Sequence, residues 1–445
     1  MSGYSPHTDK DRKEFLSSIG APDVESLFQD VPKKARLKGE ASLPPPLSEE
    51  ALMREITKLS GKNLNLDDAV SFLGGGAYNH FVPSVVRHIL GRSEFYTAYT
   101  PYQAEASQGT LQAIYEYQSL VCGLTGMDAA NASMYDGATA LAEAASLACQ
   151  ATKRKEILVS AAVHPSYRDV LKTYGKAASW TIKEIPFDGS GKTDVSLLLK
   201  ETTEKTAAVL LSQPNFFGCF EETNSLSDGV RSKGALFIVS VDPVSLGILS
   251  PPGQYGADIV TGEGQGAGNA VSFGGPLLGI FAIKEKYLRL MPGRLSGKTK
   301  DQNGRRGFVM TLQTREQHIR RERATSNICS NEALNALAST VYLAALGRQG
   351  LKKVAELCLH KANYLKKELS SLRGIEVPFP SRTFKEFAIK TNEPPGKINK
   401  RLLKENIIGG LALEELYPEL KNHMLLSVTE LTKKKDMDRL IKALK

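Results

Sequence analysis

The chain has 445 residues, 41% of them hydrophobic, which is enough to bury the cores of two or three domains. Its 57 Lys and Arg residues exceed its 48 Asp and Glu residues, but they are scattered, which argues against a nucleic-acid-binding protein. Residues 1–30 contain no apolar signal-peptide core and no later stretch could cross a bilayer, so we expect a cytoplasmic protein without a membrane partner. The five cysteines form neither a CxxC pair nor a Cys/His cluster, so we expect no metal and no disulfide framework.

In chain order, residues 1–70 form a polar N-terminal arm with a short amphipathic helix over 10–19. Residues 71–325 alternate short apolar runs, such as 207–211 and 236–241, with longer helical patterns. This alternation predicts an α/β domain, a mostly parallel sheet covered by helices on both faces. A long helix is expected from about residue 325 to 346. It opens a smaller C-terminal α+β domain, residues 326–445, with strands near 384–389 and 423–428.

A glycine-rich run at 262–267 formally matches the GxGxxA dinucleotide fingerprint. Residues 269–276 that follow include a Gly-Gly-Pro and cannot begin the helix that would hold a pyrophosphate. The chain also lacks the P-loop, GxSxG and HExxH motifs. These observations disfavour nucleotide-binding, hydrolase and metalloprotease functions.

Four positions in the large domain make chemical sense together. Thr139 opens an alanine-rich helix whose N–H groups could hold a phosphate, and His164 follows an apolar strand, where its ring could stack on a ligand. Asp242 follows the apolar run 236–241 and could pair with a protonated pyridine nitrogen. Gln265 lies at the end of the next predicted strand, after residues 257–260. The alternatives are a capped helix that binds nothing and a histidine that simply packs.

In order and spacing these four positions resemble the cofactor site of fold-type I pyridoxal-phosphate enzymes. Where such an enzyme has the lysine that binds the cofactor, this chain has Gln265, and an amide cannot form an imine. The nearest lysine, Lys284, begins a charged stretch and is interpreted as a surface residue. We therefore expect a vestigial cradle made of Thr139, His164, Asp242 and Gln265.

Two longer stretches, 96–109 and 313–329, resemble signatures of the glycine dehydrogenase (decarboxylating) family, the P-proteins of the glycine cleavage system. Shorter matching pieces occur at 4–32, 251–253, 256–260, 274–276 and 291–294, so the resemblance spans essentially the whole chain. The resemblance implies a pyridoxal-phosphate-dependent transferase fold of type I, with a mostly parallel seven-stranded sheet in the large domain.

In that family some organisms carry one long chain with two related halves, and others split it into two subunits, the second of which bears the lysine. This chain resembles the first half. The resemblance implies a glycine dehydrogenase (aminomethyl-transferring) that is active only with a second, lysine-bearing subunit, in an α2β2 assembly. Pyridoxal phosphate would lie in that partner, and the reaction would release CO2 from glycine and pass the aminomethyl group to the lipoylated H-protein.

A subunit without the lysine can still complete its partner's site. Tyr96, Tyr99 and Glu105 are candidates to orient glycine or handle its protons, although the tyrosines could equally be interface residues that only pack. Arg323, Thr325 and Ser326 are candidates to reach the partner's cofactor phosphate. Two other functions stay open: a purely structural scaffold subunit, and a stand-alone pyridoxal-phosphate enzyme that uses Lys284.

Overall fold

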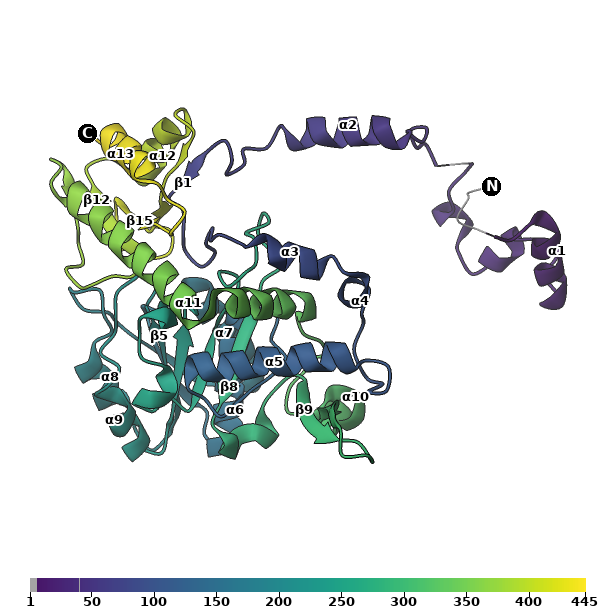
Figure 1. Cartoon of the computed structure of the whole chain (residues 1–445), viewed down its shortest axis with the longest axis horizontal. Coiled ribbons are helices and arrows are strands. Elements are labelled where there is room, and N and C mark those ends of the chain that lie inside the picture. The colour runs from purple at the N-terminus through teal and green to yellow at the C-terminus, as the bar shows by residue number, and fades with distance from the viewer. Residues whose placement is uncertain (1–5, 40) are drawn as a thin grey trace. The chain divides into compact units, whose positions relative to one another are not determined.

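The computed structural model describes residues 6–39 and 41–445, and the chain divides into two compact units, Met1–Leu64 and Asn65–Lys445 (Figure 1). The first unit contains helices α1 (Asp9–Ser18) and α2 (Glu49–Ser60), with 3₁₀ turns at Glu25–Phe28 and Lys33–Ala35. Thr8 caps α1, because its hydroxyl accepts a hydrogen bond from the Asp11 N–H while the Asp11 carboxylate accepts from the Thr8 N–H. The predicted helix at 10–19 is confirmed. Neither α1 nor α2 buries a side chain.

A seven-stranded sheet forms the centre of the second unit. Its order is β2-β8-β7-β6-β5-β3-β4, and β4, β3, β5, β6 and β7 run parallel, while β8 runs antiparallel to both β7 and β2. The prediction of a mostly parallel seven-stranded sheet is confirmed. The strand bounds are β2 (Ala129–Ala130), β3 (Glu156–Ser160), β4 (Thr181–Ile185), β5 (Thr206–Gln213), β6 (Leu236–Val241), β7 (Ile259–Glu263) and β8 (Gly279–Ile283).

Helices cover both faces of this sheet because its strands are apolar on both sides. In β5, Ala208 and Leu210 pack in one core with α6 (Gly137–Thr152) and α7 (Pro165–Ala178), whereas Val209 and Leu211 pack in the opposite core. That opposite core contains α5 (Gln108–Thr125), α8 (Val195–Glu201) and α9 (Leu226–Ser232). The carboxyl ends of β5, β6 and β7 therefore meet at one edge of the sheet, between the two helical layers.

A second, antiparallel sheet of order β11-β12-β15-β14 lies toward the C-terminus. The predicted strands near 384–389 and 423–428 are confirmed as β12 (Glu386–Thr391) and β15 (His423–Ser427). Phe72 belongs to the core beneath this sheet, because β1 (Val70–Ser71) pairs in parallel with β13 (Ile407–Ile408). The remaining elements are β11 (Ile375–Glu376), α12 (Pro395–Leu403), β14 (Leu411–Ala412) and α13 (Lys434–Ala443). The predicted domain boundaries after residues 70 and 325 stay predictions.

The long helix α11 (Ala333–Ser370) begins later than predicted. The N–H groups before it are bonded to side chains elsewhere: those of Cys329 and Ser330 donate to the Tyr135 hydroxyl, and that of Glu332 donates to the Ser133 hydroxyl. These bonds replace helical ones and hold the segment extended. Gly347 adopts a φ of 60° and breaks α11 in its middle, a conformation that favours glycine.

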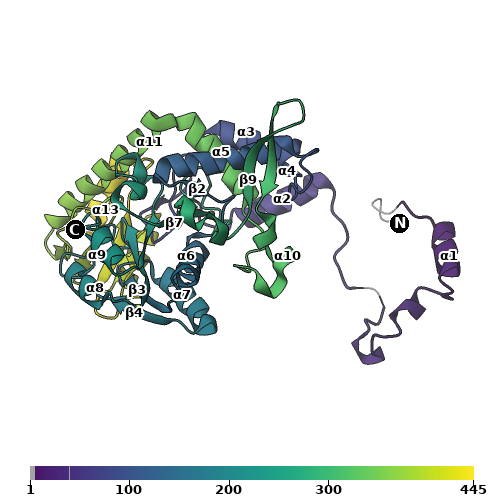
Figure 2. The same ribbon diagram turned by 90° about the horizontal axis from the view of Figure 1, so that it is seen from below.

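The remaining helices and strands are α3 (Ser84–Leu90), α4 (Ser93–Tyr96), α10 (Gln317–Arg320) and the hairpin β9 (Leu295–Lys300) with β10 (Arg306–Thr311), which stands out in Figure 2. Short 3₁₀ turns lie at Ser245–Gly247, Pro252–Tyr255, Glu285–Leu290, Gln313–Arg315 and Arg321–Arg323. Every helix found in residues 6–39 and 41–445 is too short or too polar to serve as a membrane span.

Candidate functional site

The N-terminus of α6, the predicted phosphate-binding helix, is bonded to a carboxylate of the chain itself. The Gly137 N–H donates to Glu263 Oε2 at 3.0 Å, and the N–H groups of Gln265 and Leu278 donate to Glu263 Oε1, each at 2.9 Å. Burial raises the pKa of Glu263 to about 7, although the three N–H donors favour its charged form. Glu263 thus lies where a helix N-terminus would attract an anion.

Thr139 is hydrogen-bonded to Asp136 in the first turn of α6. Its N–H donates to Asp136 Oδ1 at 2.7 Å, and its hydroxyl donates to the Asp136 carbonyl at 3.1 Å. Gly137 has no room for a side chain, because a Cβ there would lie 2.4 Å from the Tyr167 hydroxyl. The sequence signal for a phosphate loop therefore corresponds here to a capped helix packed against a tyrosine.

Asp242 forms an ion pair with a lysine that the sequence analysis missed. Lys385 Nζ lies 2.6 Å from Asp242 Oδ2, and the Lys385 side chain is only 3% exposed. The same ammonium lies 3.4 Å from the centroid of the Tyr78 ring and 3.1 Å from His80 Nε2. Lys385 precedes β12, so only the packing of the second sheet against the first brings it to the end of β6. No sequence motif marks it.

Gln265 holds a neighbouring loop in place. Its Oε1 accepts from the Tyr78 N–H at 2.8 Å, and its Nε2 donates to the carbonyls of Tyr78 and Asn269 at 3.1 and 2.7 Å. The residue is 1% exposed, so its amide is buried and fully bonded. Gln265 thereby fixes the segment that carries Tyr78 beside the end of β7.

His164 is held in the same way. Its Nε2 donates to the Gly75 carbonyl at 2.7 Å and its Nδ1 accepts from the Ser166 N–H at 3.1 Å, so the ring is the neutral tautomer. Burial lowers the pKa of His164. The ring stacks on Tyr167 with centroids 4.9 Å apart. Tyr167 therefore covers a face of the His164 ring that was expected to stack on a ligand.

These contacts leave a cavity of about 60 Å³ at the cradle, lined by His164, Asp242, Glu263, Tyr78 and Glu386 among others. Pockets that bind small molecules usually have volumes of about 300–1,000 Å³. Pyridoxal phosphate would need the position of the Glu263 carboxylate for its phosphate and that of Lys385 for its pyridine nitrogen. The residues present do not fit the cofactor.

Beside the cradle, His80, Cys358 and Glu430 bring possible metal ligands within 4.8 Å of one another. His80 Nδ1 is already 2.6 Å from Glu430 Oε2, and its other ring nitrogen lies against the Lys385 ammonium. A metal cation would have to displace these bonds and face the lysine charge. The cluster is better explained as the buried polar support of Lys385.

Lys284 lies at the opposite edge of the sheet. Its Nζ forms an ion pair with Asp258 Oδ1 at 3.3 Å, just before the amino end of β7, and it is partly exposed. The cradle lies at the carboxyl end of β7. Because that end is five residues after Asp258, the two positions are about 16 Å apart at roughly 3.3 Å per residue. The predicted surface lysine therefore lies well away from Asp242 and Gln265.

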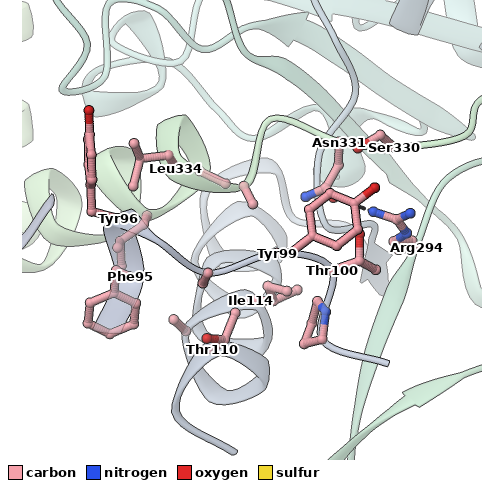
Figure 3. A pocket seen from close by; sticks show the side chains of 16 residues that line it. Phe95, Tyr96, Tyr99, Thr100, Thr110, Ile114, Arg294, Ser330, Asn331 and Leu334 are labelled. Atoms are coloured by element: carbon pink, nitrogen blue, oxygen red, sulfur yellow. Dashed lines mark hydrogen bonds between the residues drawn. The ribbon is translucent and has the colours of Figure 1, made fainter. Parts of the chain in front are cut away.

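The tyrosine segment presents an open surface instead. Tyr96 ends α4 and is 69% exposed, Tyr99 in the following loop is 88% exposed, and Glu105 is exposed as well. Tyr102 is exposed too, but its hydroxyl accepts from Arg294 Nη2 at 3.3 Å. We name the cavity of about 200 Å³ beside this segment the tyrosine pocket (Figure 3). It is lined by Phe95, Tyr96, Ala98, Tyr99, Thr100, Pro101, Thr110, Ala113, Ile114, Arg294, Ser330, Asn331, Ala333, Leu334, Ala336 and Leu337.

The other predicted contact segment is anchored on α6. The Thr325 carbonyl accepts from Gln150 Nε2 at 2.9 Å, and the Ser326 hydroxyl accepts from the Ile328 N–H at 3.0 Å. The Arg323 side chain is 82% exposed, and its Nε forms a long ion pair of 3.8 Å with Glu322 Oε1. The tyrosine pocket and the cradle share no lining residue, so the predicted site residues fall into separate places.

The fold defines the class of protein. The structure superposes on the Burkholderia pseudomallei sphingosine-1-phosphate lyase with a TM-score of 0.67 at 14% identity, covering 93% of each chain. Together with the sheet order and the position of the cradle, this likeness gives the chain the fold of the fold-type I pyridoxal-phosphate enzymes.

Sequence comparisons identify the family within this fold class. Residues 2–444 match the family described as "Glycine cleavage system P-protein". The chain is 54% identical over 437 residues to the "Probable glycine dehydrogenase (decarboxylating) subunit 1" of Desulforamulus reducens, covering 98% of both chains. It also matches a crystal structure of the glycine decarboxylase (P-protein) of the glycine cleavage system, in inhibitor-bound form, with a TM-score of 0.92, 43% identity and 99% coverage of both chains. The chain belongs to the glycine cleavage system P-protein family.

Proposed function

We propose that this chain is the non-lysine-bearing subunit of a two-subunit glycine decarboxylase. With its partner it would convert glycine and the lipoylated H-protein into aminomethyl-dihydrolipoyl H-protein and CO2. The observation that carries the proposal is the closure of the chain's own cradle by Glu263, Lys385 and Gln265 in a member of the P-protein family. Relatives named "subunit 1" support a second subunit as the partner.

The pyridoxal phosphate would then be held by the second subunit. When bound there it supplies an electron sink for the carbanion that forms as CO2 leaves. The closed cradle supports this assignment, because the partly buried Asp242 already has a cationic partner in Lys385 and the first N–H group of α6 already donates to the carboxyl group of Glu263. We also propose the α2β2 assembly that the family resemblance implies and a cytoplasmic location.

The chain's contribution would come from its open surface. Tyr96, Tyr99 and Glu105 are exposed and have hydroxyl or carboxylate groups that can orient glycine or move a proton at its amino group. Arg323 extends from the segment that ends at Thr325 and Ser326, and its free side chain suits a phosphate in the partner. A purely structural role for the same segments is the competing function.

The test is glycine-dependent release of CO2 with lipoylated H-protein and added pyridoxal phosphate. It is measured for this chain, for the lysine-bearing subunit and for their mixture. We expect turnover only in the mixture, and no cofactor absorbance from this chain alone after gel filtration. Turnover by this chain alone would contradict the proposal. A stable cofactor complex of this chain would contradict the assignment of the cofactor to the partner.

A further inference from the structure

Arg294 is a buried cation without an anionic partner. It lies just before β9 and is 6% exposed. Its Nη1 is 3.4 Å from Asn331 Oδ1 and its Nη2 is 3.3 Å from the Tyr102 hydroxyl, two long bonds to neutral acceptors. Its Nε has no hydrogen-bond partner, and within residues 6–39 and 41–445 it forms no ion pair. Because a buried unpaired charge is costly, such a group normally has a counter-ion.

The guanidinium lies at the polar end of the tyrosine pocket. Figure 3 shows it beside Asn331, with the ring of Tyr99 and Thr100 close by. Arg294 is the sole charged residue in the described lining of the pocket, and the lining includes the apolar side chains of Ile114, Leu334 and Leu337. The pocket thus combines one positive charge with a small apolar chamber.

We propose that the tyrosine pocket binds a carboxylate group at Arg294, with the apolar part of the ligand against Ile114 and Leu334. A guanidinium offers parallel N–H donors that match the two oxygens of a carboxylate. A phosphate dianion fits less well, because a single positive charge in an apolar chamber would leave its second negative charge unpaired. The carboxylate can come from a free short-chain monocarboxylate or from an Asp or Glu side chain of the second subunit.

The first experiment uses the isolated full-length chain and does not depend on the proposed function. Butyrate is titrated into the protein and its binding is measured by calorimetry. n-Butylamine, which has a positive charge, and inorganic phosphate, which carries more negative charge than butyrate, are titrated in the same way for comparison. We expect saturable binding of butyrate alone, and at least about a tenfold loss of affinity in Arg294→Gln, since hydrogen bonds to charged groups contribute about 1.5–3 kcal/mol. The control Arg289→Gln changes a nearby exposed arginine and should leave binding unchanged.

The second experiment identifies the source of the carboxylate. Association with the lysine-bearing subunit is measured for wild type and Arg294→Gln at low and high salt. If the partner supplies the carboxylate, Arg294→Gln weakens association at least about tenfold and butyrate competes with the partner. If the ligand is free, association is unchanged while butyrate binding by the isolated chain is lost.

The inference is overturned if folded Arg294→Gln changes neither butyrate binding nor subunit association, or if phosphate or butylamine binds as well as butyrate. Should Arg294→Gln fail to fold, Ala113→Leu gives the same information, because it fills the apolar chamber and leaves the guanidinium in place. We then expect weaker butyrate binding in Ala113→Leu, and unchanged binding would again overturn the inference.

Discussion

The cradle and the tyrosine pocket differ in how their charges are balanced. In the cradle every charge has a partner inside the chain: Asp242 pairs with Lys385, and Glu263 accepts three backbone N–H groups. In the tyrosine pocket Arg294 has no anionic partner among the residues that the structure describes, and Tyr96 and Tyr99 extend into solvent. Since buried charges need partners, the first region is complete in the isolated chain, whereas the second is left to be completed by another molecule.

The largest effect that would test this comparison is expected at Lys385. Lys385→Met leaves the partly buried Asp242 carboxylate unpaired, so we expect a loss of about 3 kcal/mol in the free energy of unfolding, the lower end for a buried ion pair, measured by urea denaturation. The control Lys390→Met breaks an exposed ion pair with Glu376 on the same sheet and should cost at most about 1 kcal/mol. Equal losses in the two variants would show that the cradle is not closed by this ion pair.

A slightly smaller effect is expected at Tyr99. If the tyrosine segment completes the partner's site, Tyr99→Phe should lower kcat of the mixed enzyme by about 10²-fold, the lower range for general acid–base catalysis. Association of the subunits, followed by analytical ultracentrifugation, should be unchanged. Tyr364→Phe removes a hydroxyl that bonds Asp438 and should keep full turnover. Weaker association at an unchanged kcat would favour the scaffold function instead.

The pH dependence of stability reports on the closed cradle. Burial raises the pKa of Glu263 and of Glu386 to about 7, above the value of about 4.3 in an unfolded chain. The folded chain therefore holds more protons between these values. The contribution of these two groups to the unfolding free energy should be largest below about pH 4.3 and should fall as the pH rises toward 7, by about 1–3 kcal/mol for each group.

Glu386→Gln should reduce this slope, because its amide can still bond the Gly75 N–H and the Tyr78 hydroxyl but does not titrate. The measurement is urea denaturation at pH 5, 6, 7 and 8. Glu376→Gln on the same sheet is exposed and should leave the slope as it is. A slope identical in wild type and Glu386→Gln would mean that Glu386 is ionised throughout this range.

The smallest effect is expected at Lys284. Asp258 also contacts Lys286 at 3.4 Å, so Lys284→Met should cost at most about 1 kcal/mol and should not alter turnover of the mixed enzyme. Stability by thermal denaturation and glycine-dependent CO2 release are the two measurements. Loss of turnover in a stably folded Lys284→Met would revive the hypothesis that this lysine is catalytic.

The pattern of apolar residues along the sequence was sufficient to predict the main strands of the fold. The apolar runs of β5 and β6, and the strands β12 and β15, were predicted nearly to the residue because a buried strand needs a continuous apolar run. The start of α11 was predicted eight residues too early, at 325 instead of Ala333. The N–H groups before it bond to Tyr135 and Ser133, residues distant in the sequence, and no local pattern encodes those bonds.

The sequence by itself determined the family, the sheet and the absence of a lysine at Gln265, because each of these depends on which residues follow one another. Only the tertiary structure decided which residues of the chain bond to one another at the cradle. Lys385 reaches Asp242 from a different sheet, and Glu263 reaches the first N–H groups of α6 from the end of β7. It also decided that Arg294 is buried with no counter-ion in residues 6–39 and 41–445. Charge pairing depends on distance in space, which the order of residues along the chain does not give.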